Sequence, residues 1–374
     1  MKVAMIGLKG LPATYGGVER HVEELSAALV ARGHEVVAYS RRYYTAAGVR
    51  SHRGVRIVRL PSIPTKHWDA ITHSLLATAA AIIRGNDVIH FHGAGPAFFA
   101  PLSRAAGKRT VVTIHAPDWM RSKWGPVARV ALRAGAANAR FADAVIVVSH
   151  QLQKLMRRLY GVNAEVIPNA VTVPPRMVAL DLLRRRFGLE EGRFVLFLGR
   201  FVPEKGCDLL IRAFREMKTT MRLVMAGDIR AGGGYFEKLR ALAGQDERII
   251  FPGGLYGREK EEALAHAAVF VLPSRVEGMA IGLLEALAWG CPVLVSDIPE
   301  NREVIAAAGA PLAVTFRDGD VLDLRRQLEA LLSAPIAARA RAARAAAHVR
   351  HHYNWGDVAA RTEAVYRRCF AHRV

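Results

Sequence analysis

The pattern of hydrophobic and polar positions in the first part of the chain predicts strands and helices in alternation, as in a β/α fold. Val18, Val22 and Leu25 repeat at helical spacing and Gly33 follows as a stop, which predicts a helix over Gly17–Arg32. Short apolar runs typical of buried parallel strands occur on either side of it and further along. These runs are VAMIGL at 3–8, EVVAYS at 35–40, VRIVRL at 55–60, DVIHFH at 87–92, RTVVTIH at 109–115 and DAVIVVS at 143–149. The pattern indicates a mostly parallel sheet with helices between its strands.

The rhythm breaks at 166–175, where VIPNAVTVPP has three prolines and predicts an interdomain connector. It then resumes with helices expected at 207–217, 235–243 and 282–289 and strands at 194–199, 221–227, 248–253, 268–273 and 291–296. The tail from 335 onward has a mostly helical pattern that is interrupted at 353–357. We therefore predict two doubly wound α/β domains, 1–170 and 171–355.

Length and composition describe a soluble protein of two domains. A chain of 374 residues can bury two cores, and 51% hydrophobic with 23% charged residues is typical of a globular protein. The longest apolar stretch, 75–83, falls short of the roughly 20 residues that span a membrane. Lys9 interrupts the N-terminal apolar run before a signal-peptide core forms. Three scattered cysteines without C-x-x-C spacing favour a reducing cytoplasm and no zinc site.

The net charge of +20 is concentrated in the first half of the chain. Residues 1–170 carry 23 Lys and Arg against 9 Asp and Glu, whereas residues 171–374 carry 30 against 24. A basic surface suits nucleic acid, an anionic membrane or an anionic substrate, and charge alone does not choose among them.

Two cations follow the first strand of the second domain, in the segment GRFVPEKG at 199–206. Ligands bind at the carboxyl ends of strands in open α/β sheets, so Arg200 and Lys205 lie where they could clamp a diphosphate. Gly206 frees the backbone before the next helix, whose N-terminus adds partial positive charge. A surface Arg and Lys beside a turn is the alternative interpretation.

Two acids bracket a glycine-opened helix start in EGMAIGLLE at 277–285. Glu277 could accept hydrogen bonds from sugar hydroxyls, and the amides of Gly278, Met279 and Ala280 could face phosphate. Glu285 could hold the hydroxyls of a ribose. An exposed helix carboxylate is the alternative for Glu285, although its neighbours are apolar.

The first domain offers further candidates after its own strands. GLKGLPATYGGVE places Gly16 and Gly17 at a helix start, another seat for phosphate or sugar, although it matches neither a dinucleotide nor a P-loop fingerprint. His115 directly follows a strand in TIHAPDW, with Asp118 three residues on. His90 and His92 alternate in IHFHG, but no acid or cysteine nearby in sequence completes a metal site, so we expect none.

The segment 119–133 mixes Trp119 and Trp124 with four basic residues. Such a stretch can lie on an anionic bilayer and hold a lipid-linked acceptor nearby. The alternative is a solvated helix whose tryptophans belong to the core.

Taken together in chain order, these motifs resemble the retaining glycosyltransferases of family 4. The similarity covers GLKGLPATYGGVE, TIHAPDW, GRFVPEKG, MAGD, IIFPGGL, PSRVEGMAIGLLEALAWGCPVLVSD and NWGDVAARTEAVYRR, and so nearly the whole chain. The opening segment is similar to the bacterial rhamnosyltransferase-like branch. The resemblance implies the GT-B fold, with two Rossmann-like domains, a cleft between them, and a C-terminal helix at 356–374 that crosses back to complete the first.

The resemblance also implies roles for the candidate residues. Glu277 would contact the donor sugar, His115 would lie beside it, and Glu285 would hold the ribose. Arg200 and Lys205 would bind the diphosphate, and the backbone at Ile250 and Phe251 would contact the base. Gly17 would approach the phosphate or the acceptor. The acceptor would also contact Tyr15, Gly16 and Asp118. No metal or other cofactor is expected, and no enzymic nucleophile is assigned, because retention in this family is described as a front-face reaction.

The expected function is therefore hexosyl transfer in bacterial polysaccharide or cell-surface glycan synthesis. The donor would be a UDP-, GDP- or dTDP-linked sugar and the acceptor a glycan or polyprenyl-diphosphate-linked glycan, met by the basic first domain in the cytoplasm, at the inner membrane face. A nucleotide-sugar epimerase or a phosphorylase of the same fold is an alternative, as is a nucleic-acid-binding protein. The last conflicts with dispersed basic residues and no recognisable binding module, so we expect no nucleic acid partner.

Overall fold

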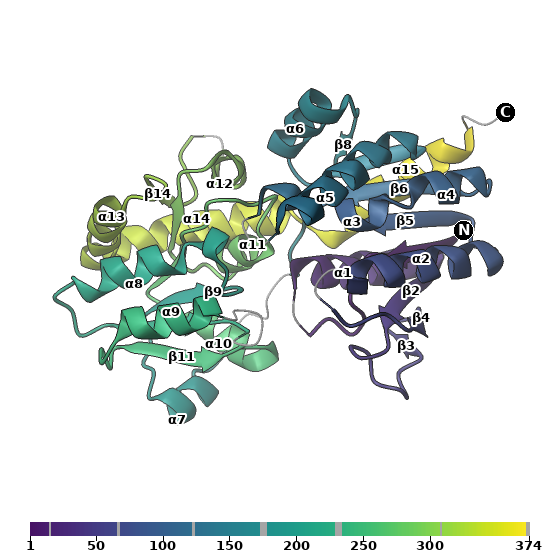
Figure 1. Cartoon of the computed structure of the whole chain (residues 1–374). Helices are drawn as coiled ribbons and strands as arrows, with labels where there is room; N and C mark the ends of the chain where they lie inside the picture. The colour runs from purple at the N-terminus through teal and green to yellow at the C-terminus, as the bar shows by residue number, and fades with distance from the viewer. Residues whose placement is uncertain are drawn as a thin grey trace. The chain divides into compact units, whose positions relative to one another are not determined.

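The structure of the protein is a computed structural model that describes residues 1–14, 16–65, 68–121, 124–172, 178–228, 234–306 and 309–371 (Figure 1). The chain divides into two compact units, the first of Met1–Ala170 with Trp355–Val374 and the second of Val171–Asn354. The sequence predicted divisions at 170/171 and 355/356, so the first coincides with the division in the structure and the second lies one residue later.

The first unit is built on an eight-stranded sheet in the order β3-β4-β2-β1-β5-β6-β7-β8. Its pairs are parallel except that between β3 and β4. Because the central strands are covered on both faces, they read as continuous apolar runs. The strands are β1 Lys2–Ile6, β2 Glu35–Arg41, β3 Ser51–His52, β4 Val55–Leu60, β5 Val88–His92, β6 Arg109–Ile114, β7 Ala144–Val147 and β8 Glu165–Val166.

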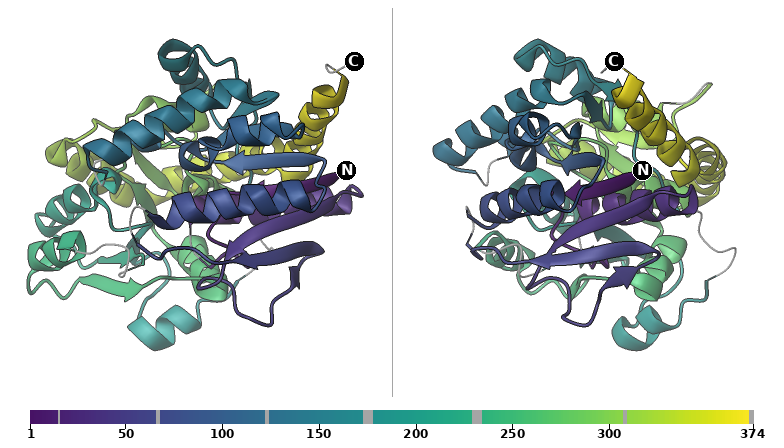
Figure 2. Two further views of the ribbon diagram at one scale, coloured as in Figure 1. Left: turned by 45° about the vertical axis from the view of Figure 1, so that its right-hand side comes forward. Right: turned by 90° about the vertical axis from the view of Figure 1, so that its right-hand side faces the viewer.

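Helices flank this sheet (Figure 2). Ser149 caps one of them: its hydroxyl oxygen accepts a hydrogen bond from the backbone N–H of Leu152 at 3.3 Å, which satisfies a donor that the first turn leaves open. The helices are α1 Gly17–Ala31, α2 Trp68–Ile83, α3 Ala94–Ala97, α4 Ala100–Ala105, α5 Pro126–Asn138, α6 His150–Tyr160 and α15 Trp355–Ala371, with 3-10 turns at Asp118–Met120 and Ala139–Phe141.

The C-terminal helix α15 is part of the first unit. Val358, Val365 and Tyr366 belong to the same buried cluster as Val3 and Val88 of the sheet. Val358, Thr362, Val365 and Cys369, which share one side of the helix at helical spacing, are all buried. The prediction that this helix completes the first domain is therefore confirmed.

The second unit contains a six-stranded parallel sheet in the order β11-β10-β9-β12-β13-β14. The chain starts at β9 in the middle, proceeds outward to β11, and then returns to β12 on the other side of β9. This reversal between β9 and β12 is the switch point of a doubly wound fold. The strands are β9 Phe194–Leu198, β10 Arg222–Ala226, β11 Ile249–Gly253, β12 Val269–Leu272, β13 Val293–Ser296 and β14 Val314–Phe316.

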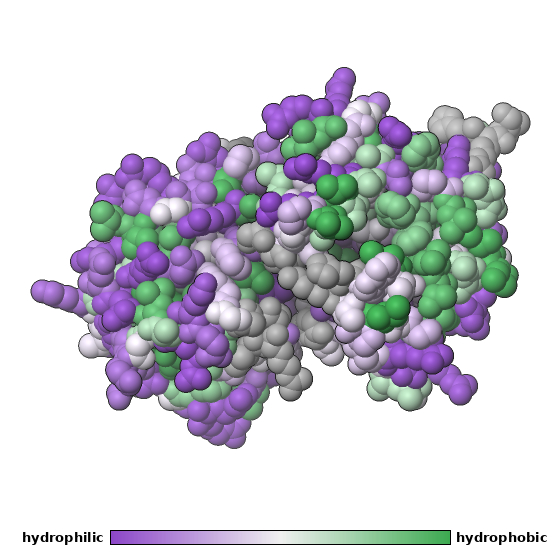
Figure 3. All heavy atoms as spheres, in the orientation of Figure 1, coloured by the Kyte–Doolittle hydropathy of each residue, from purple (hydrophilic) through white to green (hydrophobic). Residues whose placement is uncertain are grey.

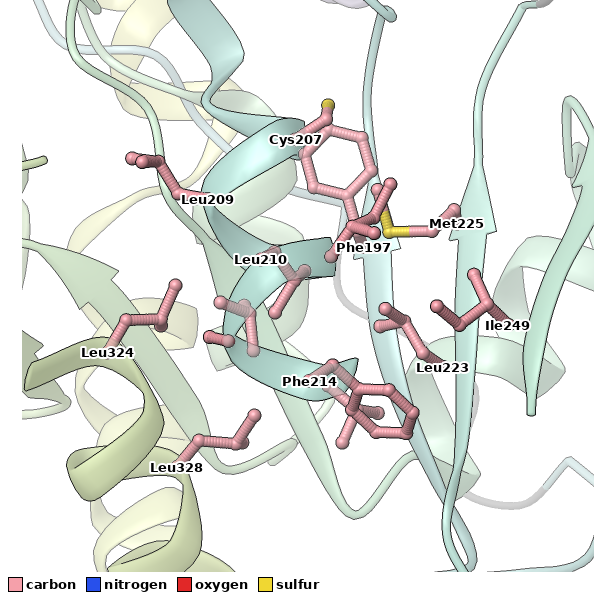
Figure 4. Packing of buried hydrophobic residues seen from close by; sticks show 14 of the residues in the cluster. Phe197, Cys207, Leu209, Leu210, Phe214, Leu223, Met225, Ile249, Leu324 and Leu328 are labelled. Carbon is pink, nitrogen blue, oxygen red and sulfur yellow. The ribbon is translucent and has the colours of Figure 1, made fainter. Parts of the chain in front are cut away.

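Helix α8 shows how the second unit packs. Its Leu210 and Phe214 lie in one cluster with Leu223 of β10, and α13 covers the other side of the helix with Leu324 and Leu328 (Figure 4). The helices of this unit are α7 Leu182–Phe187, α8 Cys207–Arg215, α9 Gly234–Ala243, α10 Gly257–His266, α11 Ile281–Ala288, α12 Pro299–Ile305, α13 Val321–Ser333 and α14 Pro335–His352, with a 3-10 turn at Pro203–Lys205.

Candidate functional site

Lys205 and Glu277 meet at the switch point of the second sheet. Lys205 follows β9, Glu277 follows β12, and the Lys205 Nζ donates to Glu277 Oε1 in a short ion pair. Both side chains are largely withdrawn from solvent. The sequence could place each residue after a strand, but only the order of strands brings them together at the edge where α/β sheets bind ligands.

The loops that carry this pair touch closely. Gly206 has φ +62°, and a Cβ added there would lie 2.1 Å from the carbonyl oxygen of Pro273, at the end of β12. The backbone N–H of Arg275 donates to the carbonyl oxygen of Glu204 at 2.9 Å. The two loops are thus held together, and a side chain at position 206 would force them apart.

The other candidates from the segment 277–285 lie around the start of α11. Gly278 and Met279 are buried, while Ala280 is partly exposed and caps the helix without a side-chain hydrogen bond. Arg200 lies two residues beyond β9 and is partly exposed. A helix N-terminus beside a cation suits an anion.

Glu285, in the second turn of α11, forms an ion pair with Lys260 of α10, with Nζ and Oε1 2.8 Å apart. Both side chains remain partly accessible. The sequence singled out Glu285 but missed Lys260, since GREKEE carries no motif and only the adjacency of α10 and α11 reveals the pair. A ligand hydroxyl that binds Glu285 must share this carboxylate with Lys260.

Ile250 lies in β11, which is the edge strand of the second sheet. It pairs with Val224 on one side, and the side chain is partly exposed. An edge strand leaves backbone groups on its outer side available to a ligand. The neighbouring Phe251 is packed against Phe236, with ring centroids 5.6 Å apart.

A cluster of imidazoles lies at the corresponding edge of the first sheet. His115 follows β6, and its Nε2 lies 3.1 Å from the Nδ1 of His92, the last residue of β5. The ring of His21, from α1, meets that of His115 edge-on at 4.6 Å between centroids. No motif in the sequence marks His21, because only the packing of α1 against the sheet brings it here.

Two histidines of this region, His21 and His90, have further hydrogen-bond partners. His21 Nδ1 donates to the Asn169 amide oxygen at 2.8 Å, which leaves the Nε2 of a neutral ring as the acceptor. His90 bonds through its two nitrogens to Tyr366 and Thr113, each at 2.7 Å. His90 therefore ties α15 to the sheet.

Burial keeps these imidazoles neutral. Desolvation lowers the pKa of His21 to about 4 and that of His90 to about 3. Desolvation, together with neighbouring imidazoles, also lowers the pKa of His92 and His115 well below the usual 6.5. His115 can therefore donate or accept one hydrogen bond at neutral pH without bringing a charge.

Among the described residues, His21, His92 and His115 are the group of side chains that could hold a metal ion. The ligand nitrogens of His21, His92 and His115 lie within 4.8 Å of one another. His92 and His115 already share a hydrogen bond, which uses one lone pair and one proton of the pair. The expectation that the protein works without a metal stays a prediction.

The glycine loop of the first unit is held on α1 by carboxylates. Glu19 and Glu23 accept the backbone N–H groups of Lys9 and Ala13, each at 3.0 Å. A Cβ at Gly17 would meet nothing within 4 Å.

The three candidates expected to contact the acceptor differ in what surrounds them. A Cβ at Gly16 would lie 2.0 Å from the Glu19 carboxylate. Asp118 is partly exposed and pairs with Arg121 at 3.2 Å. Tyr15 lies outside the described residues.

The stretch 119–133 had two interpretations, and its first tryptophan distinguishes them. Trp119 is buried and packs edge-on against Tyr160 at 5.4 Å. For Trp119 this agrees with the alternative in which the tryptophans belong to the core, whereas Trp124 is partly exposed. The stretch is also divided between a 3-10 turn ending at Met120 and α5, which starts at Pro126.

Two Rossmann-like units, one with a cation and acid pair at its switch point, define a ligand-binding α/β protein of the GT-B type. A model of Glycosyltransferase Family 4 matches residues 15–173, and a model of Glycosyl transferases group 1 matches residues 181–349. The chain belongs to glycosyltransferase family 4. The branch within the family that the opening segment suggested stays a prediction.

Relatives of known name cover most of the chain. A GDP-mannose-dependent alpha-(1-6)-phosphatidylinositol monomannoside mannosyltransferase of Mycolicibacterium smegmatis is 30% identical, over 83% of this chain and 85% of that protein. A D-inositol 3-phosphate glycosyltransferase of Xylanimonas cellulosilytica is 28% identical, over 94% of this chain and 91% of that protein.

Solved structures confirm the predicted GT-B fold. Sucrose-phosphate synthase from Thermosynechococcus elongatus aligns with a TM-score of 0.85 at 22% identity, over 99% of both chains. Anabaena HepE in complex with UDP and glucose aligns with a TM-score of 0.79 at 17% identity, over 97% of this chain and 98% of that one.

Proposed function

We propose that the protein moves a hexosyl group from a nucleoside diphosphate sugar, bound by the second unit, to a hydroxyl of a lipid-linked glycan. The observation that carries this proposal is the Lys205 and Glu277 pair at the switch point between β9 and β12. A single ligand with a diphosphate beside a hydroxyl-rich ring would satisfy both charges. Nucleotide sugars have this composition.

The cations of the second unit serve the leaving group. As the glycosidic bond breaks, the diphosphate gains negative charge, and Lys205 with Arg200 stabilises that charge. The N-terminus of α11 and the amides of 278–280 add to the positive potential there. Glu277 accepts hydrogen bonds from the sugar hydroxyls and orients the anomeric carbon.

The remaining contacts of the donor follow from position. Glu285 accepts hydrogen bonds from the ribose, and the backbone at Ile250 meets the base. Relatives differ in the nucleotide that their names carry, GDP-mannose for one and UDP for another. A panel of donors therefore determines the base of the nucleotide sugar.

The first unit serves the acceptor. Its surplus of basic residues attracts an anionic carrier such as a polyprenyl diphosphate at the inner face of the cell membrane. His115, neutral and beside the transferred sugar, contributes a hydrogen bond, and the loop with Gly16 and Gly17 lies on the acceptor side with Asp118. The reaction needs no metal and proceeds with retention, because the departing phosphate oxygen takes the acceptor proton on the face from which it leaves.

The test is transfer from a panel of UDP-, GDP- and dTDP-sugars to a polyprenyl-diphosphate-linked glycan. We expect one donor to react and Glu277→Gln to lose at least about a hundredfold in turnover. The control Glu237→Gln, an exposed residue of α9, should match wild type. Proton NMR of the product should give the anomeric configuration of the donor. Wild-type turnover in Glu277→Gln would overturn the site, and an inverted product would overturn retention.

A further inference from the structure

Helix α2 in the first unit has the opposite distribution of apolar side chains from that of an ordinary surface helix. It buries small or polar side chains and turns large apolar ones outward, among them Ile83, which is 84% exposed, and Trp68, which is 58% exposed. A surface helix ordinarily does the opposite, as α8 does. The buried set is His73, Ser74, Ala77, Thr78 and Ala81, and the outward set is Trp68, Ile71, Leu75, Leu76 and Ile83.

The inverted pattern is compatible with a stable helix. Small side chains let α2 lie close to β1, β4 and the short helices α3 and α4, against which it packs. Thr78 satisfies its hydroxyl by donating to the carbonyl oxygen of Ser74 at 2.7 Å. The outward face is therefore not needed to hold the helix in place.

The apolar surface continues beyond α2. Phe98, which follows α3, and Leu102 of α4 are both exposed, and Figure 3 shows hydrophobic side chains gathered over α2 and α4. Among the described residues, fifteen exposed large hydrophobic side chains lie in the first unit and three in the second. We call the outward residues of α2 together with Phe98 and Leu102 the α2 face. An apolar surface of this kind marks an interaction site.

The segment that contains α2, Phe98 and Leu102 is basic. Residues 68–138 carry eight Lys and Arg against three acids. Each of these acids is engaged within the unit, Asp69 with Arg41 at 2.7 Å, Asp87 with the backbone nitrogen of Lys2, and Asp118 with Arg121. Arg84, Arg129 and Arg133 are exposed.

An apolar surface in a basic segment favours an anionic bilayer over a second copy of the chain as the binding partner. A second copy of the chain would bring another net charge of +20 against the first, so positive surfaces would oppose one another. An anionic bilayer offers phosphates to the arginines and an apolar boundary to Trp68, Leu75 and Ile83. Within the part of the chain that is described, no helix has the length and apolar character to cross a bilayer.

We infer that the α2 face is a membrane-docking surface, on which α2 lies along an anionic bilayer with its aliphatic side chains in the headgroup boundary. This inference deepens the proposed function by placing a lipid-linked acceptor at the surface where the first unit docks. The placement of the acceptor rests on the proposed function, whereas docking itself rests on the exposure of α2, so binding to vesicles tests docking without any turnover.

The experiment is flotation of the full chain with vesicles of phosphatidylcholine, with and without phosphatidylglycerol, over a salt series. We expect binding to the anionic vesicles that falls with salt. The variant Leu75→Gln with Leu76→Gln should weaken it at least about tenfold, because two exposed apolar side chains no longer enter the boundary. The matched control is Leu322→Gln with Ile336→Gln, two exposed apolar residues of the second unit, and it should bind as wild type does.

Three results would overturn the inference. Wild type that stays unbound, or an α2 variant that binds as well as wild type, removes the docking surface. Sedimentation velocity that shows a dimer dissolved by the same α2 variant assigns the face to a second copy instead. Turnover on a water-soluble acceptor should be the same in wild type and in the α2 variant, so a failure of docking is distinct from a failure of the proposed transferase activity.

Discussion

The Lys205 ammonium and the Glu277 carboxylate form an ion pair between the ends of β9 and β12, the two strands that flank the switch point of the second sheet. Each group neutralises the charge of the other. A donor that takes both must replace their mutual attraction with a diphosphate on one side and sugar hydroxyls on the other. Recognition of the two halves of the donor is thereby coupled.

Glu285→Gln tests the assignment of the ribose. A hydrogen bond to a charged group contributes about 1.5–3 kcal/mol, so we expect KM for the donor to rise about tenfold or more while kcat stays close to wild type. A donor that carries a 2′,3′-dideoxyribose should bind the variant and wild type alike. A wild-type KM in the variant, or an effect that persists with the dideoxy donor, contradicts the role.

Gly17→Ala tests close ligand approach at the start of α1 without harming the fold. Because the added Cβ meets no atom within 4 Å, and alanine favours a helix by up to about 1 kcal/mol, the thermal midpoint should stay or rise. Activity should nevertheless fall by about tenfold to a hundredfold if the ligand approaches here. Gly234→Ala is the matched control, since it also begins a helix, in the second unit, with open space around it. Equal activity in the two variants would remove Gly17 from the site.

Acid should destabilise the first unit before it protonates the carboxylates. A histidine whose pKa is lower in the folded chain than the unfolded 6.5 binds its proton preferentially when unfolded, so stability falls as pH drops below 6.5. For His21, with a folded pKa of about 4, the loss reaches ~3 kcal/mol by about pH 4. His90 adds to the same window, since burial lowers its pKa to about 3.

Urea unfolding between about pH 7 and about pH 5 measures this loss. His90→Gln should make the pH dependence shallower by about one proton, or ~1.4 kcal/mol per pH unit. A free energy of unfolding that does not change over this range would contradict the neutral, buried imidazoles.

Removal of divalent metal should leave transfer unchanged. The nitrogens of His21, His92 and His115 are close enough to be suspected of holding an ion, so chelation is a direct test. We expect equal turnover before and after dialysis against EDTA, and no stoichiometric metal by elemental analysis. Activity that is lost and then restored by one added cation would contradict metal independence.

The sequence predicted the parts of the fold that depend on local pattern. The apolar runs became strands, and the helix expected at 207–217 is α8, Cys207–Arg215. Lys205 and Glu277 could be found because each lies beside a glycine in a recognisable segment. What could not be read was adjacency between segments far apart, which is why Lys260 and His21 were missed.

The α2 face was missed for a different reason. The sequence drew attention to the apolar stretch 75–83 only as a spanning helix that was too short. Periodicity reports that one side of a helix is apolar but not which side faces the sheet. In α2 the small residues take the buried side, so the direction had to come from the structure.

Calorimetric titration of nucleoside diphosphates is the most direct test of the donor site. We expect one of UDP, GDP or dTDP to bind wild type, and Lys205→Met to weaken that binding about tenfold to a hundredfold, whereas the exposed control Lys218→Met does not. Glu277→Gln should bind the bare diphosphate at least as tightly as wild type, because the competing carboxylate is gone. Wild-type affinity in Lys205→Met, or no binding of any nucleoside diphosphate to wild type, would contradict the account.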